Sequence, residues 1–238
     1  MRPARDLPAG EEALDCRLAV LVDHEPAVLV VEDRIREDGL PEWVDPASAV
    51  AAQHDLRDPG GAIGSIAELE TRFGIRYLAP CDARATALPE SSVDFVTSTS
   101  TLEHIPAEDL VPLLAECRRL LRPDGAFSSR IDLSDHFTHF DRSLSPYNFL
   151  RYSDRAWRLA NSSLLHQNRL RRPDYIGAFE AAGFEVVAEK PWRPDAALPD
   201  DLAPRFHSYD PADLAVVGLR IVAVPSPDAL EEREHVVG

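Results

Sequence analysis

Apolar stretches of strand length and helical stripes alternate along the chain from about residue 65 onward. Ser65 opens a capping box, so a helix is expected from there to Gly74. Segments typical of buried strands follow at residues 75–79, 93–97 and 126–133. Strand–helix–strand alternation at this spacing predicts parallel strands joined by right-handed crossovers, and therefore a doubly wound α/β sheet.

The segment between the second and third of these strands has the pattern of an amphipathic helix. Its leucines recur on one stripe over residues 110–121. Pro112 is expected in the first turn of this helix, because proline has no N–H to donate farther along it. The run Arg122-Pro123-Asp124-Gly125 is expected to end the helix and turn the chain into the next strand.

The alternation lapses over an aromatic-rich insertion at about residues 134–172 and resumes with a helix at residues 173–182. Strand patterns follow at residues 184–189 and 214–224. No helical segment of any length separates these two strands, so they are predicted to pair antiparallel and close the sheet. Residues 225–238 have the composition of a polar tail.

The first 64 residues are less regular and are expected to form a divergent segment before a core at residues 65–224. Residues 18–22 and 28–31 are strand-like. The few residues between them are too short for a helical crossover, which takes a dozen residues or more. Either the two segments form a hairpin or one of them is a turn of helix.

Charge and composition exclude few classes of protein but disfavour one kind of partner. The 238-residue chain has 41 acidic against 25 basic residues and a formal net charge of −16. Unspecific binding of nucleic acid depends on basic residues that neutralise phosphates, so no nucleic-acid footprint is expected. The densest basic spot is Arg169, Arg171 and Arg172, which a solvated helix end explains equally well.

Cysteine usage and hydropathy bear on the compartment. The three cysteines lie far apart without a CxxC motif, which indicates neither a disulfide framework nor a zinc site. No apolar stretch of membrane-spanning length or signal peptide is recognisable, so a cytoplasmic location without membrane attachment is expected. The sequence does not determine the oligomeric state.

Short motifs recur along the chain in a fixed order. They are Cys81-Asp82-Ala83-Arg84, Ser92-Val93-Asp94-Phe95-Val96, Leu102-Glu103-His104-Ile105-Pro106 and Leu121-Arg122-Pro123-Asp124-Gly125. Their order and spacing resemble class I S-adenosylmethionine-dependent methyltransferases of the type 11 kind, over roughly residues 65–190. The resemblance implies a Rossmann-like, mostly parallel sheet with an antiparallel last strand. It also implies methyl transfer from S-adenosylmethionine to an unidentified acceptor, for which a small molecule is expected.

The resemblance assigns several residues to the cofactor. The acid after the third strand of that fold pairs with the adenine amino group and the next backbone N–H meets the ring, which points to Asp82 and Ala83. Ser98 falls at the end of the following strand, where ligands bind in open α/β sheets. The ribose-binding acid is expected to be Glu32, with Asp23 as second choice. A cap or turn residue is the alternative for Asp82.

One expected motif is missing or degenerate. The first strand of the family runs into a Gly-x-Gly-type loop whose bare backbone lets the methionine portion approach. The candidates are Gly10, without a preceding strand, and the loop at residues 60–64. Either the chain begins after that strand, or it has lost cofactor binding and is a non-catalytic methyltransferase-like binding module. A different Rossmann-like nucleotide-binding enzyme is disfavoured, because no phosphate loop is present.

A polar cluster follows the third strand of the core. Asp132, Asp135, His136 and His139 could bind a metal, but a polar loop or contact with substrate is expected instead, and no metal. His104 is interpreted as a base near the acceptor or as a residue that orients other groups. Candidate catalytic residues are therefore His104, Asp132 and His136, which would act only if the acceptor must lose a proton.

The aromatic stretch from Phe137 to Trp157 has two interpretations. It forms a lid over the substrate pocket, or it packs the insertion onto the sheet, and both can hold together. The segment at residues 166–168 is expected on an exposed loop or helix without a role.

Overall fold

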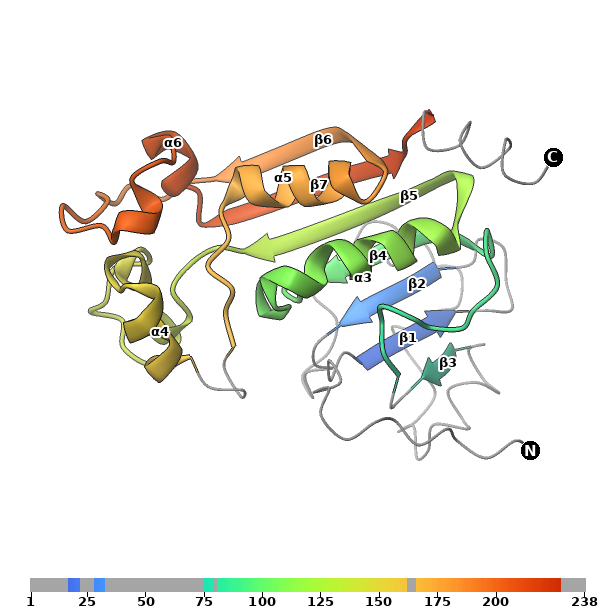
Figure 1. Cartoon of the computed structure of the whole chain (residues 1–238), viewed down its shortest axis with the longest axis horizontal. Coiled ribbons are helices and arrows are strands. Elements are labelled where there is room, and N and C mark those ends of the chain that lie inside the picture. Colours follow the sequence, from blue (N-terminus) through green and yellow to red (C-terminus); the bar gives the residue numbers. More distant parts are fainter. Residues whose placement is uncertain (1–16, 22–27, 33–74, 79–80, 162–165, 228–238) are drawn as a thin grey trace, which may run out of the picture.

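The strands of the protein form one seven-stranded sheet in the computed structural model, which describes residues 17–21, 28–32, 75–78, 81–161 and 166–227 (Figure 1). They are β1 (Arg17–Leu21), β2 (Val28–Glu32), β3 (Ile75–Leu78), β4 (Val93–Thr99), β5 (Leu121–Asp132), β6 (Phe184–Trp192) and β7 (Gly218–Pro225). Their order is β3-β1-β2-β4-β5-β7-β6. β2, β4 and β5 are parallel, and β7 pairs antiparallel with both β5 and β6. The predicted α/β sheet with an antiparallel last strand is confirmed.

Helices cover one face of the sheet and extend past one edge (Figure 1). The helices are α3 (Ala107–Leu120), α4 (Asp154–Ala160), α5 (Arg172–Ala181) and α6 (Pro211–Leu214), with the 3-10 turns η1 (Leu102–His104), η2 (His136–His139), η3 (Asn148–Arg151) and η4 (Pro204–Phe206). Within the described ranges, every helix is too short or too polar to cross a bilayer. The helix expected from Ser65 to Gly74 lies outside the described residues.

The main core lies between the sheet and the helices α3 and α5. The α3 stripe buries its leucines, as its periodicity predicts. Phe179 on α5 contacts Phe127 and Phe184 edge-on, with ring centroids 5.3 and 5.6 Å away. Pro112 lies inside α3 beyond its first turn, so the expected position was wrong. The ring is exposed, and the carbonyl that loses its donor can therefore bind water.

The N-terminal strands form a hairpin. β1 and β2 pair antiparallel, from Arg17 opposite Glu32 to Leu21 opposite Val28, which decides between the two alternatives. β3 also pairs antiparallel with β1. β1 therefore begins at the edge where β2, β3, β4 and β5 end, which we call the carboxyl edge. Both hairpin strands come from the first 64 residues and lie in the same sheet as the strands of the core.

The start of β5 contains a bulge where a turn was predicted. Val93 pairs with Leu121, but Phe95 pairs with Ala126. Residues 122–125 of β5 therefore lie opposite the single residue Asp94 of β4, which makes the bulge. A Cβ added to Gly125 would lie 2.7 Å from the Asp94 carbonyl oxygen. Glycine is therefore required at this close approach of two backbones.

A second, smaller core lies beyond the carboxyl ends of β4 and β5, where Figure 1 shows α4 and α6. Its buried side chains are Tyr147, Phe149, Leu150, Trp157, Ala203, Phe206, Leu214 and Val217. The insertion thus packs many of its aromatics, as one of the two interpretations predicts. Phe140 and Tyr152 remain exposed.

Two arginines hold this second core together. Arg171 is fully buried and donates to the carbonyls of Leu133, Leu214 and Val216. Arg169 donates to the Phe149 carbonyl at 2.9 Å and to the Asp154 carboxylate at 2.7 Å. The prediction of a solvated helix end was wrong for both, because each guanidinium is buried and its terminal nitrogens donate to protein oxygens. Burial lowers the pKa of each guanidinium to about 10, so both stay charged at neutral pH.

Candidate functional site

The carboxyl edge brings the predicted catalytic residues together. β4 leads into η1, which carries His104, while β5 ends at Asp132 and leads into η2, which begins at His136. The ring centroids of His104 and His136 are 5.0 Å apart. His136 Nε2 lies 3.9 Å from Asp132 Oδ2. Because neighbouring parallel strands end at the same edge, residues far apart in the sequence form one cluster.

The imidazole of His104 is fixed by its backbone partner. Its Nδ1 lies 2.6 Å from the carbonyl oxygen of His166. A carbonyl can only accept a hydrogen bond, so Nδ1 carries a hydrogen, and in the neutral imidazole Nε2 keeps its lone pair. His104 therefore offers Nε2 to the cluster as a base or a ligand.

Residues 166–168 brace η1, although the sequence assigned them no role. Asn168 Nδ2 donates to the carbonyls of Leu102 and Ile105 at 2.8 and 2.9 Å, and its backbone N–H donates to the Glu103 carbonyl. Gln167 is buried. The prediction of an exposed segment was wrong, because these contacts join residues more than sixty positions apart and leave no local pattern.

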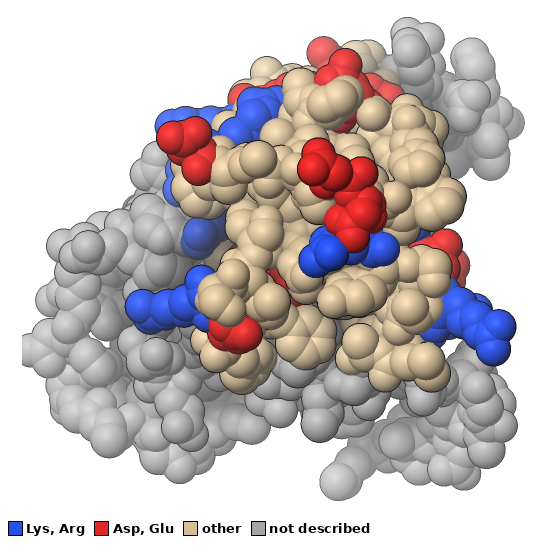
Figure 2. Space-filling view, turned by 90° about the vertical axis from the view of Figure 1, so that its left-hand side faces the viewer, with Lys and Arg blue, Asp and Glu red and all other residues tan. Residues whose placement is uncertain are grey.

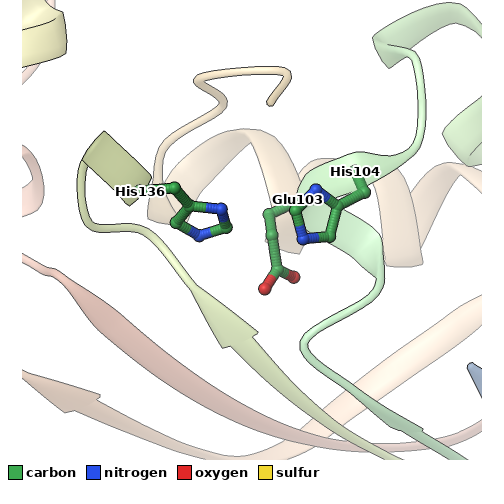
Figure 3. A group of neighbouring side chains, drawn as sticks. All are labelled: Glu103, His104 and His136. Carbon is green, nitrogen blue, oxygen red and sulfur yellow. The ribbon is translucent and has the colours of Figure 1, made fainter. Parts of the chain in front are cut away.

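Glu103 is a member of the cluster that the sequence did not single out. Its side chain is 1% exposed, and its Oε1 accepts from the Asp132 backbone N–H at 3.2 Å. Figure 3 shows the side chain of Glu103 between the imidazoles of His104 and His136. One ligand atom from each of these residues lies within 4.8 Å of the others. Its place in the Leu-Glu-His motif was the available signal.

His136 is held in its neutral form. Burial lowers its pKa to about 4; His104 and His139 also lower the pKa, while Asp132 opposes them. Its Nε2 is buried, and no hydrogen-bond partner for it lies within the described part of the chain. At neutral pH this imidazole can accept a proton or donate a lone pair to a ligand.

The remaining acids of this loop have different roles. Asp132 Oδ1 accepts from the backbone N–H and the hydroxyl of Ser134, at 2.9 and 2.6 Å, so its Oδ2 faces His136. Asp135 is fully buried and caps η2 through the Phe137 N–H, while Asn148 donates to its other oxygen. Asp135 therefore shapes the loop and does not face the cluster.

The predicted adenine-binding residues follow β3. The Arg84 backbone N–H and guanidinium both donate to the Asp82 carboxylate, at distances from 2.9 Å, and these hydrogen bonds lower its pKa. Arg84 also bonds Asp109 at 2.5 Å. Asp82 thus stabilises a turn, which was the alternative to adenine binding, and its side chain is 28% exposed. The neighbouring Ala83 is buried.

Ser98 and Glu32 also reach the carboxyl edge. The Ser98 hydroxyl is buried, as is that of its strand partner Ser129, and neither has a hydrogen-bond partner within the described ranges. Glu32 is the last residue of β2, opposite Arg17. β1 ends at Leu21, at the opposite edge of the sheet. Asp23, which follows it, lies outside the described residues.

The fit to S-adenosylmethionine differs between its two ends. The Asp82 carboxylate, whose side chain is 28% exposed, has the chemistry to accept from the exocyclic amine of an adenine, whereas Ala83 is buried. The topological switch point lies between β2 and β4, where ligands bind in open sheets. The sequence that leaves β2 there is Glu32-Asp33-Arg34-Ile35, with no glycine before Gly39. The sequence that follows β2 therefore does not contain the Gly-x-Gly pattern expected for the methionine end.

Comparison with known proteins supports the class. Residues 64–129 match the family model described as a methyltransferase domain. This match confirms the resemblance to class I S-adenosylmethionine-dependent methyltransferases over these residues. No curated protein sequence matches the chain.

Solved structures similar to the chain come from several kinds of organism. They include a methyltransferase of Haloferax volcanii in complex with a methyltransferase activator (19% identity, 59% of this chain and 57% of that chain, TM-score 0.35). Geranyl diphosphate C-methyltransferase from Streptomyces coelicolor, solved with Mg²⁺, geranyl diphosphate and S-adenosyl-L-homocysteine, shares 14% identity over 61% of this chain and 52% of its own (TM-score 0.38). The chain thus spans less than two thirds of the length of either structure.

Charge at the carboxyl edge is mixed. Figure 2 looks onto this end of the molecule and shows basic and acidic side chains interspersed on the described surface. Arg151 with Asp201, and Arg205 with Asp154, form ion pairs on the second core. Basic side chains paired in this way are less available to neutralise phosphates.

Proposed function

We propose that the protein transfers the methyl group of S-adenosylmethionine to a small molecule bound at the carboxyl edge. The observation that carries this proposal is the meeting of His104, Asp132 and His136 at the edge where the motifs of the matched methyltransferase domain end. Adenine would lie against Asp82 and Ala83, after β3. The acceptor would lie at the ends of β4 and β5.

The residues of the cluster would act on the acceptor. When bound, the cofactor supplies an electrophilic methyl group, and alignment of the acceptor accounts for most of the rate enhancement in such a displacement. An acceptor hydroxyl or ammonium group must also lose a proton. His136, neutral at pH 7, and His104 Nε2 are the groups placed to accept it, with Asp132 next to His136.

A second candidate function is a non-catalytic binding module. The observations that favour it are the charged sequence after β2 and the Arg84 guanidinium that already holds the Asp82 carboxylate. Both would weaken the hold on the cofactor. The two functions therefore differ in a single measurable property, the affinity for S-adenosylhomocysteine.

Isothermal titration of the full chain with S-adenosylhomocysteine distinguishes the two functions. Methyl transfer predicts saturable one-to-one binding that is weak, with a dissociation constant on the order of 100 µM. Asp82→Ala should weaken it about tenfold or more, through the loss of a hydrogen bond to a charged group. Asp200→Ala, at an exposed acid, is the matched control and should leave it unchanged. Absence of binding at millimolar ligand would reject methyl transfer and support the binding module.

A further inference from the structure

Two imidazoles and one carboxylate converge at the carboxyl edge, from η1 and η2. They belong to Glu103, His104 and His136, whose nearest ligand atoms lie within 4.8 Å of one another (Figure 3). Two histidines with one carboxylate form a common donor set for zinc and for non-haem iron in proteins. We propose that these three residues bind a divalent transition-metal ion of the Zn²⁺ type.

The distances agree with a shared ion. Ligands at about 2.1 Å from a tetrahedral zinc lie about 3.4 Å from one another. The ligand atoms therefore need to approach one another by up to about 1.4 Å, which rotation about side-chain bonds provides. Two imidazoles bound to one such ion would have ring centroids about 5 Å apart. The centroids of His104 and His136 are 5.0 Å apart before any movement.

The hydrogen bonds of His104 are those that proteins commonly give to a histidine bound to a metal. A histidine bound to a metal commonly donates its other ring N–H to a backbone carbonyl, which fixes the tautomer and the ring plane. His104 Nδ1 makes this bond with the His166 carbonyl. Asn168 fixes the backbone on both sides of the imidazole through Leu102 and Ile105. The Nε2 lone pair is thus aimed before any ion arrives.

Glu103 and Asp132 complete the surroundings. The Asp132 backbone N–H holds one carboxylate oxygen of Glu103, whose side chain is almost fully buried. A buried carboxylate is stabilised by a cation at short range, and an ion between the two imidazoles would supply one. Asp132 Oδ2, 3.9 Å from His136 Nε2, lies beside the same ring. Three protein ligands leave a fourth position open for water or for an oxygen atom of a bound molecule.

The neighbouring set Asp132, His136 and His139 is the weaker alternative. Its atoms also lie within 4.8 Å of one another. However, His139 is exposed at the end of η2, whereas Glu103 in the proposed set is 1% exposed. The proposed ion shares His136 with this set but not the other ligands. The proposal does not depend on methyl transfer, because a binding module would hold the ion equally well. With the ion bound, the lone pairs of His104 and His136 would bind the metal, and a water molecule in its fourth position would be the base for an acceptor.

Titration of the full chain with ZnCl₂, after EDTA treatment and dialysis, tests the site. We expect one-to-one binding with a dissociation constant of about 1 µM or below, and Glu103→Gln and His104→Asn should each weaken it about 10–100-fold. His139→Asn is the matched control, since it removes an imidazole from the alternative set, and it should leave the affinity within about twofold. Circular dichroism melting checks that each variant is folded.

CoCl₂ provides an independent readout, because Co²⁺ bound by protein ligands in four-coordination absorbs strongly in the visible range. The wild type and His139→Asn should show this absorption, whereas His104→Asn should not. If Glu103→Gln fails to fold, His104→Asn alone decides the outcome. Zinc binding that is lost in His139→Asn and kept in His104→Asn, or no saturable binding at all, would overturn the proposal. Failure of S-adenosylhomocysteine to bind, with zinc binding intact, rejects only methyl transfer.

Discussion

Single buried side chains hold together the segments at the carboxyl edge, and Arg171 is the clearest example. Its guanidinium is inaccessible to solvent. It links Leu133, which follows β5, to Leu214 at the end of α6 and to Val216. Each of these carbonyls would lose a donor if the arginine were removed. The residue is therefore structural, although it belongs to the most basic stretch of the sequence.

Replacement of Arg171 by methionine should destabilise the protein strongly. The change removes hydrogen bonds to three buried carbonyls while it keeps much of the side-chain volume, so a loss of about 3–5 kcal/mol in the free energy of unfolding is expected. Urea denaturation followed by circular dichroism measures it. Arg158→Met, at an exposed arginine of α4, should change the free energy by less than about 0.5 kcal/mol. A similar small effect at Arg171 would show that the carbonyls find other donors.

His136 provides the test of acceptor chemistry at the scale of one residue. If the protein transfers methyl groups, His136→Ala should lower kcat about 100-fold or more, because it removes the group placed to accept a proton. Affinity for S-adenosylhomocysteine should stay unchanged, since Asp82 and Ala83 lie after a different strand. His207→Ala, at an exposed histidine, serves as control. A parallel loss of kcat and cofactor affinity would indicate a collapsed site and not a missing base.

At the scale of elements, one glutamate joins α3 to the segment that follows the turn at Asp82. Glu116 accepts from the backbone N–H and hydroxyl of Thr86 and from Arg119. Burial acts to raise the pKa of this carboxyl, but the hydrogen bonds from Arg119 and Thr86 outweigh it and lower the pKa below its usual value of 4.5. The stabilisation from Glu116 is therefore present above pH 4.5 and is lost as the pH falls through the lowered value.

Glu116→Gln should reveal this pH dependence. At pH 7 the variant should be less stable by about 1.5–3 kcal/mol, the range for hydrogen bonds to a charged group. The difference should shrink as the pH falls through the lowered pKa of Glu116, where the wild-type carboxyl becomes protonated and neutral like the glutamine. Urea denaturation at several pH values measures it, with Glu180→Gln at an exposed position of α5 as control. A difference independent of pH would assign the effect to packing.

The bulge in β5 allows a comparison between two glycines. Gly125→Ala should destabilise by about 1–3 kcal/mol, because the new methyl group would press on the Asp94 carbonyl, which cannot move within the sheet. Gly177 lies exposed in α5 with no atom within 4 Å of an added Cβ. Gly177→Ala should instead stabilise by about 0.5–1 kcal/mol, the helix propensity difference. Thermal melting of both variants measures the two changes in stability. If both variants were stabilised or both destabilised, the result would contradict the bulge geometry.

At the scale of the whole molecule, local periodicity predicted the core, and long-range contacts decided the rest. Strands β3, β4 and β5 and the helix α3 each follow from patterns within a dozen residues. The antiparallel pair β6–β7 was also predicted, but β7 begins at Gly218 and not at Leu214, which ends the short helix α6. The hairpin was one of two alternatives, because connection length excludes a crossover but does not choose a pairing.

The site was predictable only in part, for the same reason. His104, Asp132 and His136 were found because they follow strands that end at one edge. Glu103 and Asn168 were missed, since the contact that matters for each joins distant segments. The buried arginines were missed because charge in a sequence ordinarily predicts exposure.

The packing of Trp157 gives the second core an optical signal of its own. Its indole is 6% exposed, donates its N–H to the Gln167 carbonyl at 3.1 Å and lies 5.0 Å beneath the Arg169 guanidinium, whereas Trp192 is 63% exposed. A shielded indole emits at shorter wavelength than one in water, so the emission of Trp157 should be blue-shifted relative to that of Trp192. Gln167 adjoins the residue that holds His104. In a background with both other tryptophans replaced, Trp43→Phe and Trp192→Phe, a rearrangement of η1 should therefore change the fluorescence without any attached dye.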